Sequence, residues 1–242
     1  MHNVKKRSTG GVLGPAVLVL MGGLAAGAAS DAGATNLIVN GGFESGNTGF
    51  TTAYTLWGGS GDLGAGEYSV TSNAASVHSG FSGSPQAGSE FFVANGSQDT
   101  SLAPWQSQAF NVTQAGTYRF EAYISSVVPP VFNGTPLAPP SLAFEISSDA
   151  GSSWTSLGST VDLTGAAAGD WYLSFADTAL TTTGSYLIRL RNDQNAFQGN
   201  DFGLDSIYFG LAALAPSAAV PGAGLAGLAT LGLAGVARRR RR

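Results

Sequence analysis

Short β-like runs separated by Gly, Asn, Ser, Pro and Asp follow one another through most of this chain, and residues 36–209 contain no convincing helical pattern. Runs of roughly four to eight residues, rich in β-branched and aromatic side chains and bounded by turn residues, are typical of strands. Nine or ten such runs predict an all-β protein folded as a β-sandwich. The predicted strands are Asn36–Asn40, Glu67–Ser72, Ser89–Ala94, Gln106–Thr113, Thr117–Ser126, Ser141–Ser148, Trp154–Leu157, Trp171–Ala176, Ser185–Asn192 and Phe202–Phe209.

Alternation assigns the two faces of two of these strands. Successive side chains of a strand point to opposite sides, so every second residue should face the core. We expect the core-facing residues to be Tyr118, Phe120, Ala122 and Ile124 in one strand and Tyr186, Ile188 and Leu190 in the other. Arg119, Arg189 and Arg191 then point outward, either paired with carboxylates across strands or forming a ligand-binding face.

The central part of the chain is acidic. Residues 31–205 carry 15 acidic residues, three arginines and no lysine, which gives a formal charge of −12. Such a surface repels nucleic acid and attracts cations, so a nucleic-acid or phosphate-binding role is disfavoured and calcium is a candidate ion.

Catalysis is difficult to build from these residue types. The chain has no cysteine, and His78 is the one histidine of its central part. A disulfide scaffold, a Cys-His nucleophile and a histidine metal cluster are therefore excluded. A pair of carboxylates could hydrolyse a glycoside, but the sequence singles out no such pair. His78 is interpreted as a loop or rim residue.

The N-terminus has the layout of a secretory signal peptide. Lys5, Lys6 and Arg7 precede an apolar stretch, residues 11–29, and small residues follow it. Two A-x-A patterns place the predicted cleavage by signal peptidase between about residues 28 and 34. The alternative is an uncleaved N-terminal membrane helix. An exported body is expected in both cases.

The C-terminus ends in an apolar segment and a basic cluster. The 18 residues from Val220 to Ala237 carry no charge and are followed by Arg238, Arg239, Arg240, Arg241 and Arg242. A helix of about 20 apolar residues spans a bilayer, and arginines beyond it stay on the cytoplasmic side. The tail is therefore either an anchor or a sorting address.

These C-terminal features resemble the PEP-CTERM sorting signal. The matching parts are Val220-Pro221, the apolar segment to Ala237 and the arginine cluster, while Gly222 stands where glutamate is typical and Ala223 replaces a second proline. The resemblance implies transient insertion in the inner membrane, processing by an exosortase, and a location at the cell surface or in the extracellular matrix of a Gram-negative, exopolysaccharide-producing bacterium. A lasting tail anchor is the alternative.

The central part resembles the galactose-binding-like jelly rolls of carbohydrate-binding modules. The resemblance rests on its opening Asn36-Leu37-Ile38-Val39-Asn40-Gly41-Gly42-Phe43-Glu44-Ser45-Gly46, on its closing Gly199-Asn200-Asp201-Phe202-Gly203-Leu204-Asp205-Ser206-Ile207-Tyr208-Phe209, and on residues 49–54 and 105–110 between them. It implies a single jelly-roll β-sandwich over residues 35–211, between a signal peptide (1–34) and a linker (212–219) that leads to the sorting helix (220–242).

The same resemblance implies a structural calcium ion held by Glu44, near the start of the body, and Asp205, near its end. Calcium prefers six to eight oxygen ligands from carboxylates and carbonyls. The alternative is that both carboxylates accept hydrogen bonds in turns.

Ligand binding is expected at exposed aromatic residues, because sugar rings stack on aromatic planes. We select Trp57, in a Gly-rich loop, and Tyr123, on the polar side of its strand. The proline-rich stretch 128–140 is predicted to be a loop, either a spacer or the rim of a cleft. Residues 147–154 resemble an Asp-box hairpin, in which Asp149 accepts turn amides and Trp154 packs beside them.

The sequence thus predicts an exported, surface- or matrix-sorted, non-enzymatic protein whose jelly roll binds extracellular polysaccharide. Two alternatives stay open: a membrane-anchored structural or adhesive protein without a sugar ligand, and a carboxylate-dependent glycoside hydrolase.

Overall fold

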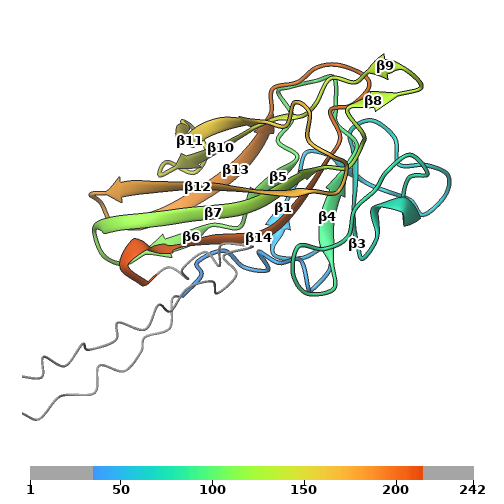
Figure 1. The fold of residues 1–242 in the computed structure, drawn as a ribbon. Helices are drawn as coiled ribbons and strands as arrows, with labels where there is room; N and C mark the ends of the chain where they lie inside the picture. Colours follow the sequence, from blue (N-terminus) through green and yellow to red (C-terminus); the bar gives the residue numbers. More distant parts are fainter. Residues whose placement is uncertain (1–34, 215–242) are drawn as a thin grey trace, which may run out of the picture. The chain divides into compact units, whose positions relative to one another are not determined.

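The computed structural model describes residues 35–214 (Figure 1). The predicted signal peptide and the sorting segment, with Val220, Pro221 and the five arginines, lie outside the described residues. No helix within residues 35–214 has the length and apolar character needed to cross a bilayer.

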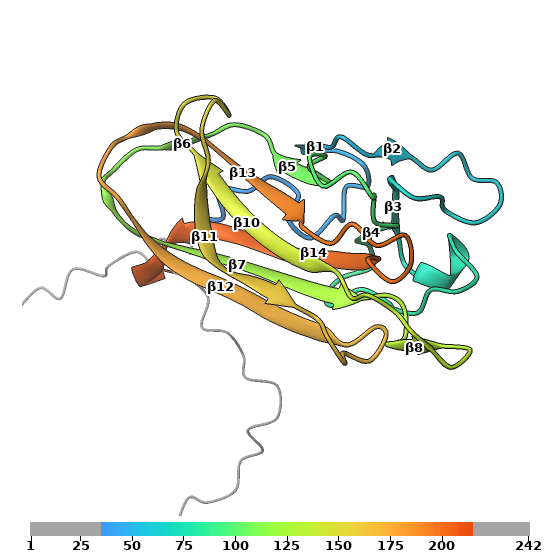
Figure 2. The ribbon, with the colours of Figure 1, turned by 90° about the horizontal axis from the view of Figure 1, so that it is seen from above.

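Two sheets form the body, which confirms the predicted all-β jelly-roll sandwich (Figures 1 and 2). The first sheet has the order β1 (Phe50–Thr51), β5 (Trp105–Ser107), β13 (Gly184–Asn192), β10 (Ser141–Ser147) and β11 (Thr155–Asp162), with β6 (Phe110–Val112) also paired to β13. The second has the order β12 (Trp171–Leu180), β7 (Gly116–Ser126), β14 (Phe202–Leu211), β4 (Phe91–Ala94), β3 (Glu67–Thr71) and β2 (Thr55–Leu56). All pairs are antiparallel except β2 with β3.

Smaller elements complete the described chain. They are the hairpin β8 (Val131–Phe132) and β9 (Thr135–Pro136) and the 3-10 helices η1 (Ala74–Ser76) and η2 (Ala212–Leu214). The hairpin lies inside the proline-rich stretch that was predicted to be a loop, and η2 begins the predicted linker.

The main core lies between the two sheets and follows the alternation of the strands. The core-facing residues expected in β7 and β13 are all buried there, as predicted. Phe120 of β7 and Phe144 of β10 meet across the sandwich with ring centroids 4.5 Å apart. The three arginines point outward and pair with carboxylates: Arg119 with Asp177, and Arg189 and Arg191 with Glu145.

The predicted strand Asn36–Asn40 is wrong, because this segment is irregular and enters a turn at Val39. The Asn36 amide donates to the Ile207 carbonyl, and its oxygen accepts the backbone N–H of Phe209. Leu37 adds a single backbone bond to Phe209. Asn40 then takes a positive φ of 53°, a conformation that asparagine tolerates and that ends extended structure.

Other boundaries also differ from the prediction. Gln106–Thr113 is divided between β5 and β6, and the strands predicted at Trp154–Leu157 and Trp171–Ala176 continue to Asp162 and Leu180. The Asp-box-like hairpin is confirmed, since Asp149 accepts the backbone N–H and the hydroxyl of Ser153, at 2.9 and 2.6 Å. Trp154 lies against this turn and under the guanidinium of Arg189, 4.2 Å from its ring centroid.

A second, smaller hydrophobic cluster lies on the outer side of β4. Phe92 and Ala94 face the main core, whereas Phe91 and Val93 point the other way and are equally buried. They are covered by side chains from loops, namely Leu63, Ala74, Val77, Phe81, Val127 and Val128. This loop layer positions the site described next.

Candidate functional site

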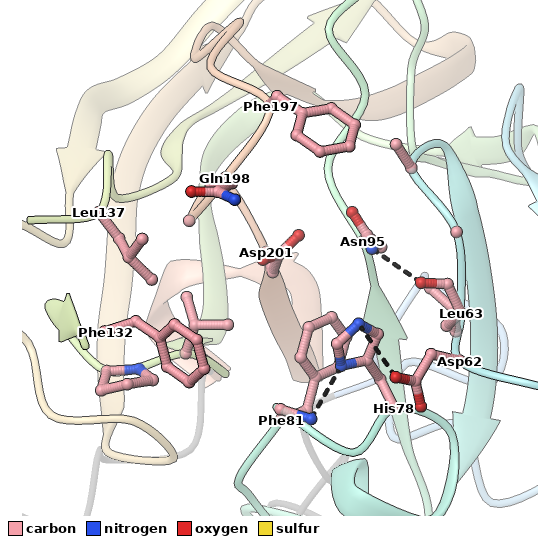
Figure 3. A pocket seen from close by; sticks show the side chains of 16 residues that line it. Asp62, Leu63, His78, Phe81, Asn95, Phe132, Leu137, Phe197, Gln198 and Asp201 are labelled. Atoms are coloured by element: carbon pink, nitrogen blue, oxygen red, sulfur yellow. Dashed lines mark hydrogen bonds and ion pairs between the residues drawn. The ribbon is translucent and has the colours of Figure 1, made fainter. Parts of the chain in front are cut away.

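A pocket of about 400 Å³ opens among the loops at one end of the sandwich (Figure 3). Five segments that are far apart in the sequence form its walls: residues 62–65, 78–81, 95, 128–137 and 197–201. The loop layer supports the first two segments, and the hairpin β8–β9 contributes the fourth. A concave site formed by several loops is the usual place for a small-molecule ligand.

Aromatic rings line three sides of the pocket. Phe132 of β8 and Phe197, in the loop before β14, are 54% and 64% exposed. His78 stacks on buried Phe81 with centroids 4.1 Å apart, which gives the opposite wall a flat, partly polar surface. Figure 3 shows Phe132 and Phe197 on two sides of the opening and His78 across from Phe132.

Asp201 lies at the centre of the pocket, immediately before β14. It is only 6% exposed, and its carboxylate accepts the backbone N–H groups of Gly96 and Gly199. Burial raises the pKa of Asp201 to about 6, although these hydrogen bonds favour the charged form. The pocket therefore holds a buried acid that titrates close to neutrality.

Asn95 and Asp62 add hydrogen-bond acceptors. Asn95 donates its amide hydrogen to the Leu63 carbonyl at 2.8 Å, so its oxygen stays an acceptor beside Asp201. Asp62, on the rim, accepts the side-chain and backbone hydrogens of Ser79, and these bonds lower its pKa.

His78 is oriented by its neighbours. Gly80 donates its backbone N–H to Nδ1 of His78 at 3.0 Å, which places the proton of the neutral ring on Nε2. Nε2 lies 3.9 Å from Oδ2 of Asp62. The structure thus places His78 on the rim of the pocket, as interpreted from the sequence.

Neither of the predicted ligand-binding residues lines this pocket. Trp57 packs, partly buried, against the loop layer. Tyr123 lies on the outer face of β7, between Leu173 of β12 and Asp205 of β14. The structure does not bring Trp57 and Tyr123 together at the pocket, and their roles in binding stay predictions.

Glu44 and Asp205 hold the two halves of one loop. Asp205, which is fully buried, accepts the backbone N–H groups of Gln86 and Ala87, while Glu44 accepts those of Ser89 and Glu90. Burial raises the pKa of Asp205 to about 6, and the charge of Glu44 adds to this shift.

The two carboxylates are engaged in hydrogen bonds in this arrangement. Each of their four oxygens already accepts an N–H or O–H donor, from residues 86–90 or from Ser206. Within residues 35–214 no group of three or more His, Asp or Glu side chains gathers as a metal site. In this arrangement the pair fits the hydrogen-bonding alternative, and calcium binding stays a prediction.

Phe132 and Phe197 were not selected from the sequence. Phe132 precedes the turn Asn133-Gly134 in the proline-rich stretch, and Phe197 lies among Gln, Asn and Gly residues. The usable signal was a large apolar ring inside a turn-forming segment, where no strand could bury it. Asp201 was part of the closing motif but carried no signal that distinguished it from Asp205.

No family model matches the chain, and no curated protein matches it. The xylan-binding domain CBM22-1 of Paenibacillus barcinonensis Xyn10C has a similar structure, with 15% identity, a TM-score of 0.45, and coverage of 74% of this chain and 96% of that domain. The module TmCBM61, solved with β-1,4-galactotriose, gives 20% identity, a TM-score of 0.44, and coverage of 72% and 97%. The enzymatically active domain of tailspike protein 4 of bacteriophage CBA120 gives 12% identity, a TM-score of 0.47, and coverage of 73% of this chain and 21% of that one.

Proposed function

We propose that the chain is an exported, surface- or matrix-sorted, non-enzymatic protein whose jelly roll binds a saccharide in the loop pocket. The observation that carries this proposal is the pair of exposed rings, Phe132 and Phe197, beside a concave site with buried acceptors.

The chemistry of the pocket suits a sugar ring. The C–H faces of a pyranose stack on aromatic planes, and its hydroxyl groups need acceptors placed at the ring edge. Phe132 and Phe197 offer the planes, and Asp201 and Asn95 offer the acceptors. The cavity volume, about 400 Å³, lies within the usual range of roughly 300–1,000 Å³ for ligand pockets.

The test is calorimetric titration and affinity gel electrophoresis of the body, residues 35–214, with a panel of soluble polysaccharides. We expect binding without product, and a loss of at least about tenfold in affinity when Phe132 and Phe197 are both changed to Ala. Phe175→Ala is the matched control, because this phenylalanine of β12 is as exposed but lies on a sheet face. Equal losses in both variants, or no binding to any polysaccharide, would contradict the proposal.

A glycoside hydrolase is the second candidate, supported by one observation. Asp62 and Asp201 line the same pocket, and their environments shift their pKa values in opposite directions. Such divergence separates the acid from the base in many enzymes. Release of reducing ends, abolished by Asp201→Asn, would favour this candidate over pure binding.

Export and sorting rest on the two ends of the sequence. Intact-mass measurement of the protein extracted from the cell surface tests both: we expect loss of the residues before about residue 35 and of those beyond about Val220. Retention of the five arginines would favour the membrane-anchored structural or adhesive protein.

Calcium binding by Glu44 and Asp205 is tested by thermal denaturation with millimolar calcium and with a chelator. A ligand that binds only the folded state raises the melting temperature, so a higher value with calcium, abolished in Glu44→Gln, is expected. Identical curves would leave only the hydrogen-bonding role of the pair.

A further inference from the structure

The carboxylates of the pocket differ from those on the sheets in their partners. Residues 35–214 contain three arginines and no lysine, and all three arginines, already described, pair with carboxylates on the outer faces of the sheets. None of them is among the described residues that line the pocket. Asp62 and Asp201 therefore give the pocket a negative charge that no arginine or lysine of the described chain compensates.

The rings around the pocket favour the same kind of ligand. A cation within about 6 Å of an aromatic face is attracted by the negative charge density of that face, and the attraction is stronger when the cation is removed from water. Phe132 and Phe197 present such faces on two sides of the opening, with Asp201 between them (Figure 3). The pocket thus combines rings that attract a cation with a carboxylate in its centre.

Asp201 also has hydrogen-bonding capacity for a donor. Two backbone N–H groups occupy part of its four lone-pair positions. Hydrogen bonds from an ammonium group to a carboxylate are about twice as strong as neutral ones, and a buried carboxylate gains most from them. A hydroxyl supplies one donor, whereas an ammonium group supplies three and a positive charge.

We infer that the pocket selects saccharides with a free, protonated amino group over their N-acetylated or hydroxylated counterparts. This inference rests on the proposed saccharide binding at the same pocket and adds the chemical class of the sugar. Acetylation removes both the charge and two of the donors, while the ring that stacks on Phe132 and Phe197 stays the same.

Three β-1,4-linked oligomers of equal length test the selection, because they differ only in the group at C2: glucosamine, N-acetylglucosamine and glucose. Calorimetric titration of the body near pH 6.5 and low salt should give the glucosamine oligomer an affinity at least about tenfold higher than the other two. Affinity for it should fall with added salt, since Asp62 is exposed to solvent.

The pH dependence provides a second readout. The titratable groups around Asp201 are Asp62 and His78 in the pocket and Tyr54 behind it, whose hydroxyl accepts the Ser97 N–H. Affinity for the glucosamine oligomer should fall below about pH 6, as Asp201 takes up a proton, and again at high pH, as the amine loses its own. His78→Gln separates a contribution of the histidine from that of Asp201.

Variants locate the selection. Asp201→Asn should reduce the preference for the glucosamine oligomer by about tenfold. Asp62→Asn, made independently, should reduce it by less. Asp177→Asn is the matched control, because it removes a carboxylate from the sheet face and should leave the preference unchanged.

The possible failures are distinguishable. Equal affinity for the three oligomers, still dependent on Phe132 and Phe197, would overturn the amino-sugar inference and leave the saccharide-binding function standing. Binding of none of the three, together with none of the polysaccharide panel, would overturn both. Binding of lysine peptides but of no glucosamine oligomer would overturn the inference that the ligand is an amino sugar and would leave only a preference of the pocket for cations.

Discussion

The pocket and the outer face of β7, β12 and β14 carry similar side chains in different surroundings. On the sheet face, Phe175 is 63% exposed beside Asp177 and Glu121, much as Phe197 is exposed near Asp201. There, however, Arg119 forms a two-bond ion pair with Asp177, at 2.8 and 2.9 Å, and lies 6.0 Å from the Phe175 ring centroid. The protein itself supplies the cation that this ring and carboxylate attract.

The pocket has no such cation, because residues 35–214 contain no lysine and none of their arginines lines the pocket. The two regions therefore contain similar side chains but differ in the pairing of their charges and in shape. The sheet face is flat and its carboxylate is paired with an arginine, whereas the pocket is concave and negatively charged. An exposed aromatic ring beside a carboxylate indicates a binding site only when the protein does not pair these groups itself.

Removing the support of the pocket should have the largest effect. Phe91→Ala deletes a fully buried ring of β4 that the loop layer covers and that meets Trp171 edge-on at 5.6 Å. We expect the free energy of unfolding to fall by about 3–5 kcal/mol, as for other buried Phe-to-Ala changes, and ligand affinity to fall with it. Urea denaturation of this variant and of Phe175→Ala measures the difference, since the exposed ring should cost only about 0.5 kcal/mol or less. A loop layer that can be truncated without loss of stability would show that the pocket does not depend on it.

The uncompensated charge of the pocket should appear in the pH dependence of stability. The folded-state pKa of Asp201, about 6, lies above its ordinary value of 3.8, so the folded protein binds this proton more tightly than the unfolded chain. The stabilisation that protonated Asp201 contributes is fully present below about pH 4 and is lost as the pH rises to about 6. It amounts to at most about 3 kcal/mol in the free energy of unfolding.

Asp201→Asn removes this contribution. Between pH 4 and 6 the variant should lose less stability than the parent protein, measured by denaturant unfolding in a chelator so that bound cations do not interfere. The same slope in both proteins would mean that Asp201 titrates at its ordinary pKa, and the pocket would then resemble the sheet face electrostatically.

The smallest effect is expected for Arg119→Ala, which makes the sheet face resemble the pocket in charge. Arg119 is partly exposed and Asp177 is exposed, and such surface pairs contribute little to stability. The affinity of the pocket for its ligand should change by less than about twofold, because surface charges more than a Debye length apart are screened. New binding of the glucosamine oligomer by this variant, insensitive to Phe132→Ala, would show that charge alone creates a site.

The predictable parts of the molecule were those that obey a local rule. The alternation of apolar with polar side chains in β7 and β13 identifies their core faces, and the Asp149 turn follows from side-chain hydrogen bonds within a few residues. β4 lacks such a signal because all four of its residues are buried, two on each side. The composition of Asn36–Asn40 predicts a strand. In the structure the side chain of Asn36 bonds to the backbone of β14 near its end, in place of the regular backbone hydrogen bonds of a strand pair.

The pocket could not be predicted from local patterns, because its residues come from positions 62 to 201 and meet only through the loop layer. Tyr123 and Trp57 were selected because aromatic residues in polar surroundings suggest exposure. The first lies on the sheet face and the second packs against the loop layer.

The course of β14 determines how the body would carry mechanical load. Its first residue follows Asp201 of the pocket, and its last is joined to η2 near the C-terminal end of the described chain. Ten residues at about 3.3 Å each span at most roughly 33 Å, with an irregularity in the ladder between Asp205 and Tyr208. A pull between a ligand in the pocket and residue 214 would act along this strand and shear its ladders with β7 and β4, so that many hydrogen bonds resist the force together rather than opening one after another.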